Sequence, residues 1–177
     1  KARPGTLNFS SSGVGSASQM AIELFKYMTK TDMVHIGYSG GGPAIMALLS
    51  GQVSIFTGSI LAGLSHFKSG RLIPLGLTGT KRDPAIPEVP TIAESGLPGY
   101  ELQEYQGFVV PLGTPSAVIE RLNAETVKAL AQPELRERFT TQGAQIIAST
   151  PEQLNDHIRK QTALWAKVIK SAGIKLN

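Results

Sequence analysis

The sequence contains no cysteine, and this absence removes several classes of chemistry at once. Disulfide bonds, thiolate nucleophiles and cysteine-ligated zinc sites are all excluded. No stretch approaches the roughly 18 consecutive apolar residues that a membrane-spanning helix needs. Charged residues are also scarce, at 17% of the chain, which is too few for a disordered, strongly solvated polypeptide.

A strong excess of either charge is lacking as well. The 17 basic and 13 acidic residues give a net charge of only +4. The densest charged segment has both signs, in Glu134, Arg136, Glu137 and Arg138, which is typical of a solvated helix face. Nucleic acid is therefore not an expected partner. The mild positive balance favours anionic ligands at long range.

What the chain does have is enough apolar sequence to fold. Apolar residues make up 41% of its 177 residues, sufficient for one compact domain or two small lobes. The opening Lys1–Gly5 has the character of an earlier helix that stops at a Pro-Gly turn. We therefore expect this chain to begin inside a larger protein, whose targeting segment would lie outside it.

The first eighty residues alternate short strands with helices. This alternation predicts βαβ units and a mainly parallel sheet. The predicted strands are residues 7–11, 33–38, 53–56 and 72–77, and the predicted helices are residues 16–29, 43–49 and a short helix that ends near residue 68.

Beyond residue 80 the pattern becomes more helical. Predicted helices cover residues 115–131, 133–142 and 151–172, and two short strands are predicted at 106–110 and 144–148. Val118, Leu122 and Val127 recur at helical spacing, which indicates one apolar face.

Three strand-to-helix turns carry the strongest functional signal. Ligands of open α/β sheets bind beyond the carboxyl ends of the strands, where helix N-termini offer backbone N–H groups and a positive dipole end. All three turns are uncharged and rich in glycine or serine. The candidate ligand-binding residues are Ser11, Ser12, Gly13, Gly15, Ser16, Tyr38, Gly40, Gly41, Gly42, Pro43, Thr57 and Ser59.

Catalytic signals are poor by comparison. The three histidines lie far apart in the sequence, and structural or surface roles are expected for them. Ser11 and Ser16 lack the flanking glycines of a nucleophile elbow, and no base is expected to partner either serine. No P-loop or complete dinucleotide fingerprint is present. We therefore expect a binding protein with no cofactor, no metal and no catalytic residue.

Several motifs, in order along the chain, resemble one known family. They are PGTLNFSSSGVGS at 4–16, HIGYSGG at 35–41, LSGQV at 49–53, TGTKR at 78–82, PEVPT at 87–91, GLPGY at 96–100, PLGTP at 111–115 and TPE at 150–152. Together with Gly107, Trp165 and residues 173–175, this set is similar to the Bug family, the solute-binding proteins of tripartite tricarboxylate transporters. The resemblance covers essentially the whole chain.

The resemblance implies an α/β type II periplasmic-binding-protein fold, in which two lobes close on a ligand. Residues 1–105 would form most of the ligand-binding lobe without its first strand and helix. Residues 106–177 would return to the other lobe. The chain would thus be about the C-terminal three-fifths of a periplasmic protein that binds a small carboxylate and delivers it to membrane permease subunits. Where the other lobe is absent, homodimerisation is expected.

Two positions depart from the family pattern. Gln19 stands where the family commonly has histidine. Thr57-Gly58-Ser59 stands where an acidic or amide residue is common, so we expect a plain carboxylate ligand more than one that bears an ammonium group.

Two other interpretations remain open at this point. The same bilobed fold serves as an effector-sensing module in transcriptional regulators and signalling proteins. A hydrolase or transferase with an unrecognised serine nucleophile is the less favoured reading.

Overall fold

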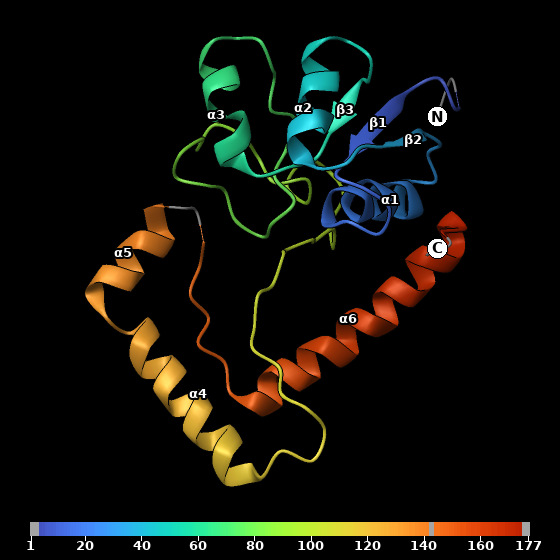
Figure 1. Cartoon of the computed structure of the whole chain (residues 1–177). Helices are drawn as coiled ribbons and strands as arrows, with labels where there is room; N and C mark the ends of the chain where they lie inside the picture. The colour runs from blue at the N-terminus through green and yellow to red at the C-terminus, as the bar shows by residue number, and fades with distance from the viewer. Residues whose placement is uncertain (1–3, 142–143, 175–177) are drawn as a thin grey trace. The chain divides into compact units, whose positions relative to one another are not determined.

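The computed structural model describes residues 4–141 and 144–174, so the sequence features at residues 1–3, Gln142 and Lys175 lie outside the described residues. The chain consists of two compact units (Figure 1). The first unit comprises residues 1–104 and 167–177, and the second unit comprises residues 105–166. The assignment of these units to lobes of a larger protein stays a prediction.

A parallel sheet lies at the centre of the first unit (Figure 1). Its strands are β1 (Asn8–Ser11), β2 (Val34–Gly37) and β3 (Ile55–Phe56), in the order β2-β1-β3. In the register, Phe9 pairs with both His35 and Ile55. The central strand is fully buried beyond Asn8, as expected when both faces of a parallel sheet are covered. The first three predicted strands are thereby confirmed.

Two helices connect these strands. Helix α1 (Ala17–Thr29) joins β1 to β2, and helix α2 (Gly41–Leu49) joins β2 to β3. Because the two crossovers run in opposite directions along the sheet, right-handed connections place α1 and α2 on opposite faces. The side chains of β1 alternate accordingly: Lys26 of α1 lies over the Phe9 ring, whereas the Ser10 hydroxyl donates to Ala44 O of α2 at 3.1 Å.

The core of the first unit surrounds α1. Met20, Ala21 and Leu24 are buried along one side of this helix. Tyr100, from a distant loop, is 2% exposed and donates its hydroxyl to Ala21 O at 2.9 Å. Its ring stands edge-on to Phe25. A long-range contact of this kind fixes the loop to the helix and leaves no buried polar atom unpaired at Tyr100.

The connection after helix α3 (Ile60–Lys68) differs from its prediction. The predicted strand at 72–77 is wrong, since the only pairing there among the described residues is an isolated bridge between Leu77 and Thr91. Pro74 supplies no N–H group, and Ile73 and Leu75 are 79% and 75% exposed. An apolar alternating segment becomes a strand only where a neighbouring strand accepts and donates along its length.

The second unit is helical where it is regular. It contains α4 (Ser116–Leu130), α5 (Pro133–Thr141) and most of α6 (Pro151–Ala172), which confirms the three predicted helices up to Thr141 and from Pro151 onward. The rings of Tyr105 and His157 of α6 contact each other at a tilt of 48°, with a centroid distance of 3.9 Å. The Asn123 amide donates to Ser149 O at 2.9 Å.

The two short strands predicted in this unit are not formed. Residues 106–110 and 144–148 carry no strand structure. Phe108 and Val109 are each 83% exposed, and Ala148 has a left-handed φ of 51°, which extended backbone does not adopt. Neither segment pairs with another strand among the described residues.

Helices α1 to α6 are too short or too polar to cross a bilayer, as far as the described ranges 4–141 and 144–174 extend.

Candidate anion-binding site

Three turns meet at the carboxyl edge of the sheet because all three strands are parallel. The first turn is residues 10–16 after β1, the second is residues 38–43 after β2, and the third is residues 57–59 after β3. Direct contact joins the first two, since Tyr38 N–H donates to Ser11 O at 3.0 Å. The pairing of Ser10 with Phe56 brings the third turn beside the first.

The first turn is held by its own hydroxyl groups. Ser16 caps α1: its Oγ donates to Gly13 O at 2.7 Å and accepts from Gln19 N–H at 3.3 Å. Ser18 Oγ accepts from Ser12 N–H at 2.9 Å. The φ angles of Gly13 and Gly15, 129° and 78°, explain why both positions are glycine.

Backbone N–H groups remain available at the start of α1. Those of Ala17 and Ser18 belong to the first helical turn and meet no acceptor within the part of the chain that the structure describes. They add to the positive end of the helix dipole. The edge of the sheet therefore presents hydrogen-bond donors without a competing carboxylate.

The second turn is open and starts its helix earlier than predicted. Helix α2 begins at Gly41, two residues before Pro43, and Gly40 caps it without a side-chain hydrogen bond. A Cβ added at Gly40, Gly41 or Gly42 would meet no atom within 4 Å. Gly41 and Gly42 are exposed, so space beside them is open to another molecule. Tyr38 is half-buried beside them.

The third turn is built more tightly. Ser59 caps α3 by accepting from Ala62 N–H at 3.4 Å. A Cβ at Gly58 would collide with the ring of Phe56, so a side chain at this position would require that ring to move. Thr57 is half-buried, and Ser59 is exposed. No acidic or basic side chain (Asp, Glu, Lys, Arg or His) belongs to any of the three turns.

A histidine unexpectedly lies against the first turn. We expected no base to lie beside a candidate serine, and as regards position that expectation is wrong, because Ser11 Oγ and His35 Nε2 are 2.6 Å apart. On the other side of the ring, Gln19 Nε2 is 3.2 Å from His35 Nδ1. Ser11 is fully buried, and its hydroxyl also donates to Gly13 O at 3.0 Å.

The surroundings of His35 favour the neutral imidazole. Burial lowers the pKa of His35, the carboxylate of Glu23 opposes this by raising it, and Lys26 lowers it further. Glu23 is itself 4% exposed and paired with Lys26 at 3.0 Å, so the two charges largely offset each other. Within residues 4–141 and 144–174, no three acidic or histidine side chains form a cluster that could hold a metal ion.

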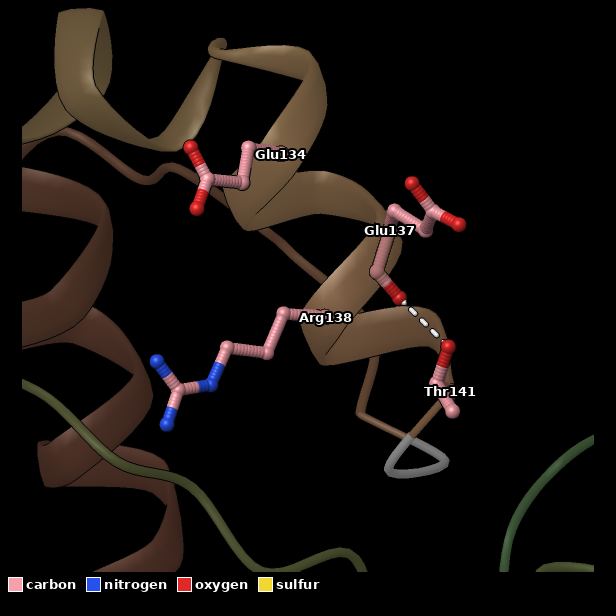
Figure 2. A pocket seen from close by; sticks show the side chains of 4 residues that line it. All are labelled: Glu134, Glu137, Arg138 and Thr141. Atoms are coloured by element: carbon pink, nitrogen blue, oxygen red, sulfur yellow. Dashed lines mark hydrogen bonds between the residues drawn. The ribbon is translucent and has the colours of Figure 1, made fainter.

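A separate hollow lies on α5 and has a different character (Figure 2). It is lined by Glu134, Glu137, Arg138 and Thr141. Figure 2 shows Glu137 extending to the opposite side of the helix from Glu134 and Arg138, while Thr141 Oγ donates to Glu137 O of its own helix at 2.8 Å. Because these charged groups do not point toward a common centre, the hollow is an exposed helix face of mixed charge.

The structure brings all twelve predicted binding residues to one edge of the sheet, and it adds three residues that the sequence interpretation missed. Ser18, Gln19 and His35 hold the first turn from behind. A signal for Gln19 was present, because Ser16 and Gln19 have the spacing of a helix capping box. The position of His35 depends on strand register: it lies diagonally from Ser11 on the same face of the sheet.

Comparisons with known proteins agree with this architecture. The family model described as "Tripartite tricarboxylate transporter family receptor" matches residues 1–174. Protein BugT of Bordetella pertussis is 35% identical over 176 residues, which are 99% of this chain and 54% of BugT.

Two solved structures are similar in fold. Rpa4515 of R. palustris with adipate has a TM-score of 0.80 and 32% identity, and the match covers 98% of this chain and 58% of that one. MatC (Rpa3494) from Rhodopseudomonas palustris with bound malate has a TM-score of 0.73 and 32% identity, over 93% and 57% of the two chains.

The predicted fold class, an α/β fold of periplasmic binding proteins present in part, is thereby confirmed. The chain spans about half the length of the first curated relatives that it matches. The match over residues 1–174 settles the resemblance that the motifs indicated, and the chain belongs to the tripartite tricarboxylate transporter receptor family, which includes the Bug proteins.

Proposed function

We propose that this chain forms the part of a periplasmic receptor that holds one carboxylate group of a small organic acid. The observation that carries the proposal is the convergence of uncharged Gly/Ser turns, with the N-termini of α1 and α2, at one edge of the sheet. The adipate and malate complexes of two similar proteins support the choice of ligand class. The receptor would deliver its ligand to the membrane subunits of a tripartite transporter.

The chemistry of the turns suits a carboxylate. Ala17, Ser18, Gly41 and Gly42 supply backbone N–H donors at two helix N-termini, where negative charge is favoured. The Tyr38 hydroxyl and the Thr57 and Ser59 side chains lie at the same edge and would complete the contacts. Since none of these groups is charged, the site binds an anion without burying a competing ion pair.

The absence of acidic side chains from all three turns bears on ligand choice. An ammonium group on the ligand would require a carboxylate partner, and Glu23, the buried one near the first turn, is paired with Lys26. We therefore propose a di- or monocarboxylic acid without an amino group as the ligand.

Binding without turnover is the proposed role, despite the contact between Ser11 and His35. A serine nucleophile needs a base that accepts its proton. Here Gln19 offers an N–H to His35 Nδ1, which puts the imidazole proton on Nε2, facing Ser11. His35 therefore donates to Ser11 and does not activate it. The receptor-family match also favours transport over the effector-sensing alternative.

The test places a charge where the ligand carboxylate would lie. Gly42→Asp introduces a carboxylate at the second helical position of α2, and Gly42→Asn introduces its neutral isostere. A Cβ at position 42 meets no atom within 4 Å, and Asp near a helix N-terminus favours folding. Binding of adipate and malate is measured by calorimetry, and folding by thermal unfolding.

We expect wild type and Gly42→Asn to bind one of the acids and Gly42→Asp to lose at least about tenfold in affinity, since a like charge close by costs more than about 1.4 kcal/mol. Equal affinities for the Asp and Asn variants would contradict the placement of the site. No binding by any form, with folding intact, would contradict the function.

A further inference from the structure

The side-chain amide of Gln19 has one orientation, and Gly15 determines it. Gly15 N–H donates to the Gln19 side chain at 2.8 Å. A backbone N–H only donates, so the atom that faces it is the amide oxygen. The amide nitrogen of Gln19 consequently faces His35 Nδ1.

That orientation fixes the proton on His35. An amide nitrogen donates and does not accept, so His35 Nδ1 accepts and carries no hydrogen. The proton of the neutral imidazole is then on Nε2, from where it is donated to Ser11 Oγ at 2.6 Å. Ser11 passes its own hydroxyl hydrogen to Gly13 O and accepts from Gly13 N–H at 3.2 Å.

These bonds form one directional chain, from Gly15 N–H through Gln19, His35 and Ser11 to Gly13 O. Both ends of this hydrogen-bond chain lie in the first turn, on its two glycines with left-handed φ, Gly13 and Gly15. The two middle members of the hydrogen-bond chain belong to other elements: His35 lies on β2 and Gln19 lies on α1. The shape of the turn is therefore tied to two separate elements of the fold.

We propose that His35 and Gln19 are positioning residues of the carboxylate site, which hold the first turn in its binding shape only while His35 is neutral and carries its proton on Nε2. This rests on the proposed function, because the first turn must be part of the binding site. Neither residue touches the ligand; both act through Ser11 and the backbone of Gly13 and Gly15.

Protonation of His35 breaks the hydrogen-bond chain between His35 Nδ1 and the Gln19 amide. A hydrogen on Nδ1 would face the hydrogens of the Gln19 amide, and two donors repel. Rotation of the amide would relieve this contact but would remove its oxygen from Gly15 N–H. The titratable groups around the ring are Glu23 and Lys26 of α1, with opposite effects, whereas β1 presents the uncharged ring of Phe9 at a centroid distance of 5.0 Å.

The first arm of the test observes the proton directly. Long-range ¹H–¹⁵N spectra of the histidine side chains distinguish the two neutral tautomers and the imidazolium. We expect His35 of the wild-type chain to be the neutral Nε2–H tautomer at pH 7.5. Gln19→Glu keeps an oxygen for Gly15 N–H and presents another to Nδ1, so we expect it to raise the pKa of His35 and to yield the imidazolium form.

His66 and His157, in the same spectra, serve as internal controls, because neither contacts residue 19. A wild-type His35 with its proton on Nδ1, or a Gln19→Glu variant with an unchanged His35 pKa, would overturn the proposal.

The second arm measures the affinity for adipate and malate between pH 8 and pH 5, a range that extends well below 6.5 because burial lowers the pKa of His35. We expect wild-type affinity to fall as His35 takes up its proton, together with shifts of the Gly13 and Gly15 amide resonances. His35→Gln does not titrate, so its affinity should be independent of this step and about fivefold weaker at pH 8, the factor for one lost neutral hydrogen bond. Identical affinities and pH profiles for the two proteins would overturn the positioning role.

The two arms of the test distinguish a failure of this proposal from a failure of the proposed carboxylate-binding function. A wild-type chain with the stated tautomer but no affinity for either acid would overturn the proposed function, and with it the ligand-related role, while the hydrogen-bond chain itself stands. Binding with the wrong tautomer would overturn only the positioning role.

Discussion

The sheet and helix α1 of the first unit bury their apolar residues, whereas helices α4 and α5 of the second unit do not. In the first unit, Phe9, Met20 and Leu24 are at most 8% exposed, and the central strand has no solvent-facing side beyond Asn8. In the second unit, helices α4 and α5 bury no residue, and the apolar stripe of α4 at Val118, Leu122 and Val127 is 46%, 51% and 37% exposed. Both units have amphipathic helices, but among the described residues α1 of the first unit is covered on its apolar side, whereas α4 and α5 of the second unit are not.

The difference shows what an amphipathic pattern specifies. A stripe of apolar residues determines where a helix forms and which side it will bury, but the burying surface has to come from elsewhere. In the first unit that surface is the sheet and the loop that carries Tyr100. The described residues of the second unit provide no comparable surface for α4. Stability measurements should therefore distinguish the two units sharply.

The largest contrast is expected between Phe9→Ala and Leu122→Ala. Phe9 is completely buried under α1, so its truncation leaves a cavity and should lower the free energy of unfolding by about 3–5 kcal/mol. Leu122 is 51% exposed on α4, and its truncation should change stability by no more than about 0.5 kcal/mol. Urea unfolding followed by circular dichroism measures both. A loss of several kcal/mol for Leu122→Ala would show that α4 is covered in solution.

A smaller contrast is expected between two hydroxyl groups. Tyr100→Phe removes the hydroxyl that donates to Ala21 O and leaves that buried carbonyl without this donor, which should cost about 1–1.5 kcal/mol. Thr126 donates to Leu122 O on the exposed surface of α4, and Thr126→Val should have an effect near zero because water replaces the bond. Equal losses of unfolding free energy for Tyr100→Phe and Thr126→Val would show that the two hydroxyl groups do not differ in burial.

The pH dependence of stability provides a third contrast. Burial lowers the pKa of His35 below its usual 6.5, so the unfolded chain takes up this proton at a higher pH than the folded chain. In that window the unfolded state binds more protons, and the free energy of unfolding falls as the pH drops below about 6.5. His35→Gln should flatten this part of the profile. His66→Gln, on α3, controls for the loss of an imidazole as such, and an unchanged profile in His35→Gln would contradict the assignment.

Local sequence was sufficient for most helices and for β1 to β3. Caps at Ser16, Ser59 and Thr150, glycine turns and helical spacing all act within a few residues of the element that they specify. The predicted strands at 72–77, 106–110 and 144–148 fail for the opposite reason. A strand depends on hydrogen bonds to a neighbour, and alternation alone does not reveal whether that neighbour exists.

The candidate site divides in the same way. The three turns were predictable because glycine, serine and a following helix are adjacent in sequence. The support behind them was not, since Ser11 and His35 are 24 positions apart and meet only through the register of β1 on β2. The interpretation of the histidines as structural or surface residues therefore did not include the contact of His35 with the first turn.

The smallest expected effects come from the two ion pairs that best match across the units. Lys26–Glu23 in α1 and Arg121–Glu125 in α4 both have N–O distances of 3.0 Å, but the side chains are 18% and 5% exposed in the first pair and 78% and 51% in the second. Solvent screens the second pair, so a double-mutant cycle with Arg121→Met and Glu125→Gln should yield a coupling of only about 0.3–0.5 kcal/mol. The cycle with Lys26→Met and Glu23→Gln should yield a larger coupling that also persists in high salt, because burial limits screening. If both couplings vanish together as salt is added, the two helices are equally solvated, and the contrast between the units would not extend to their charges.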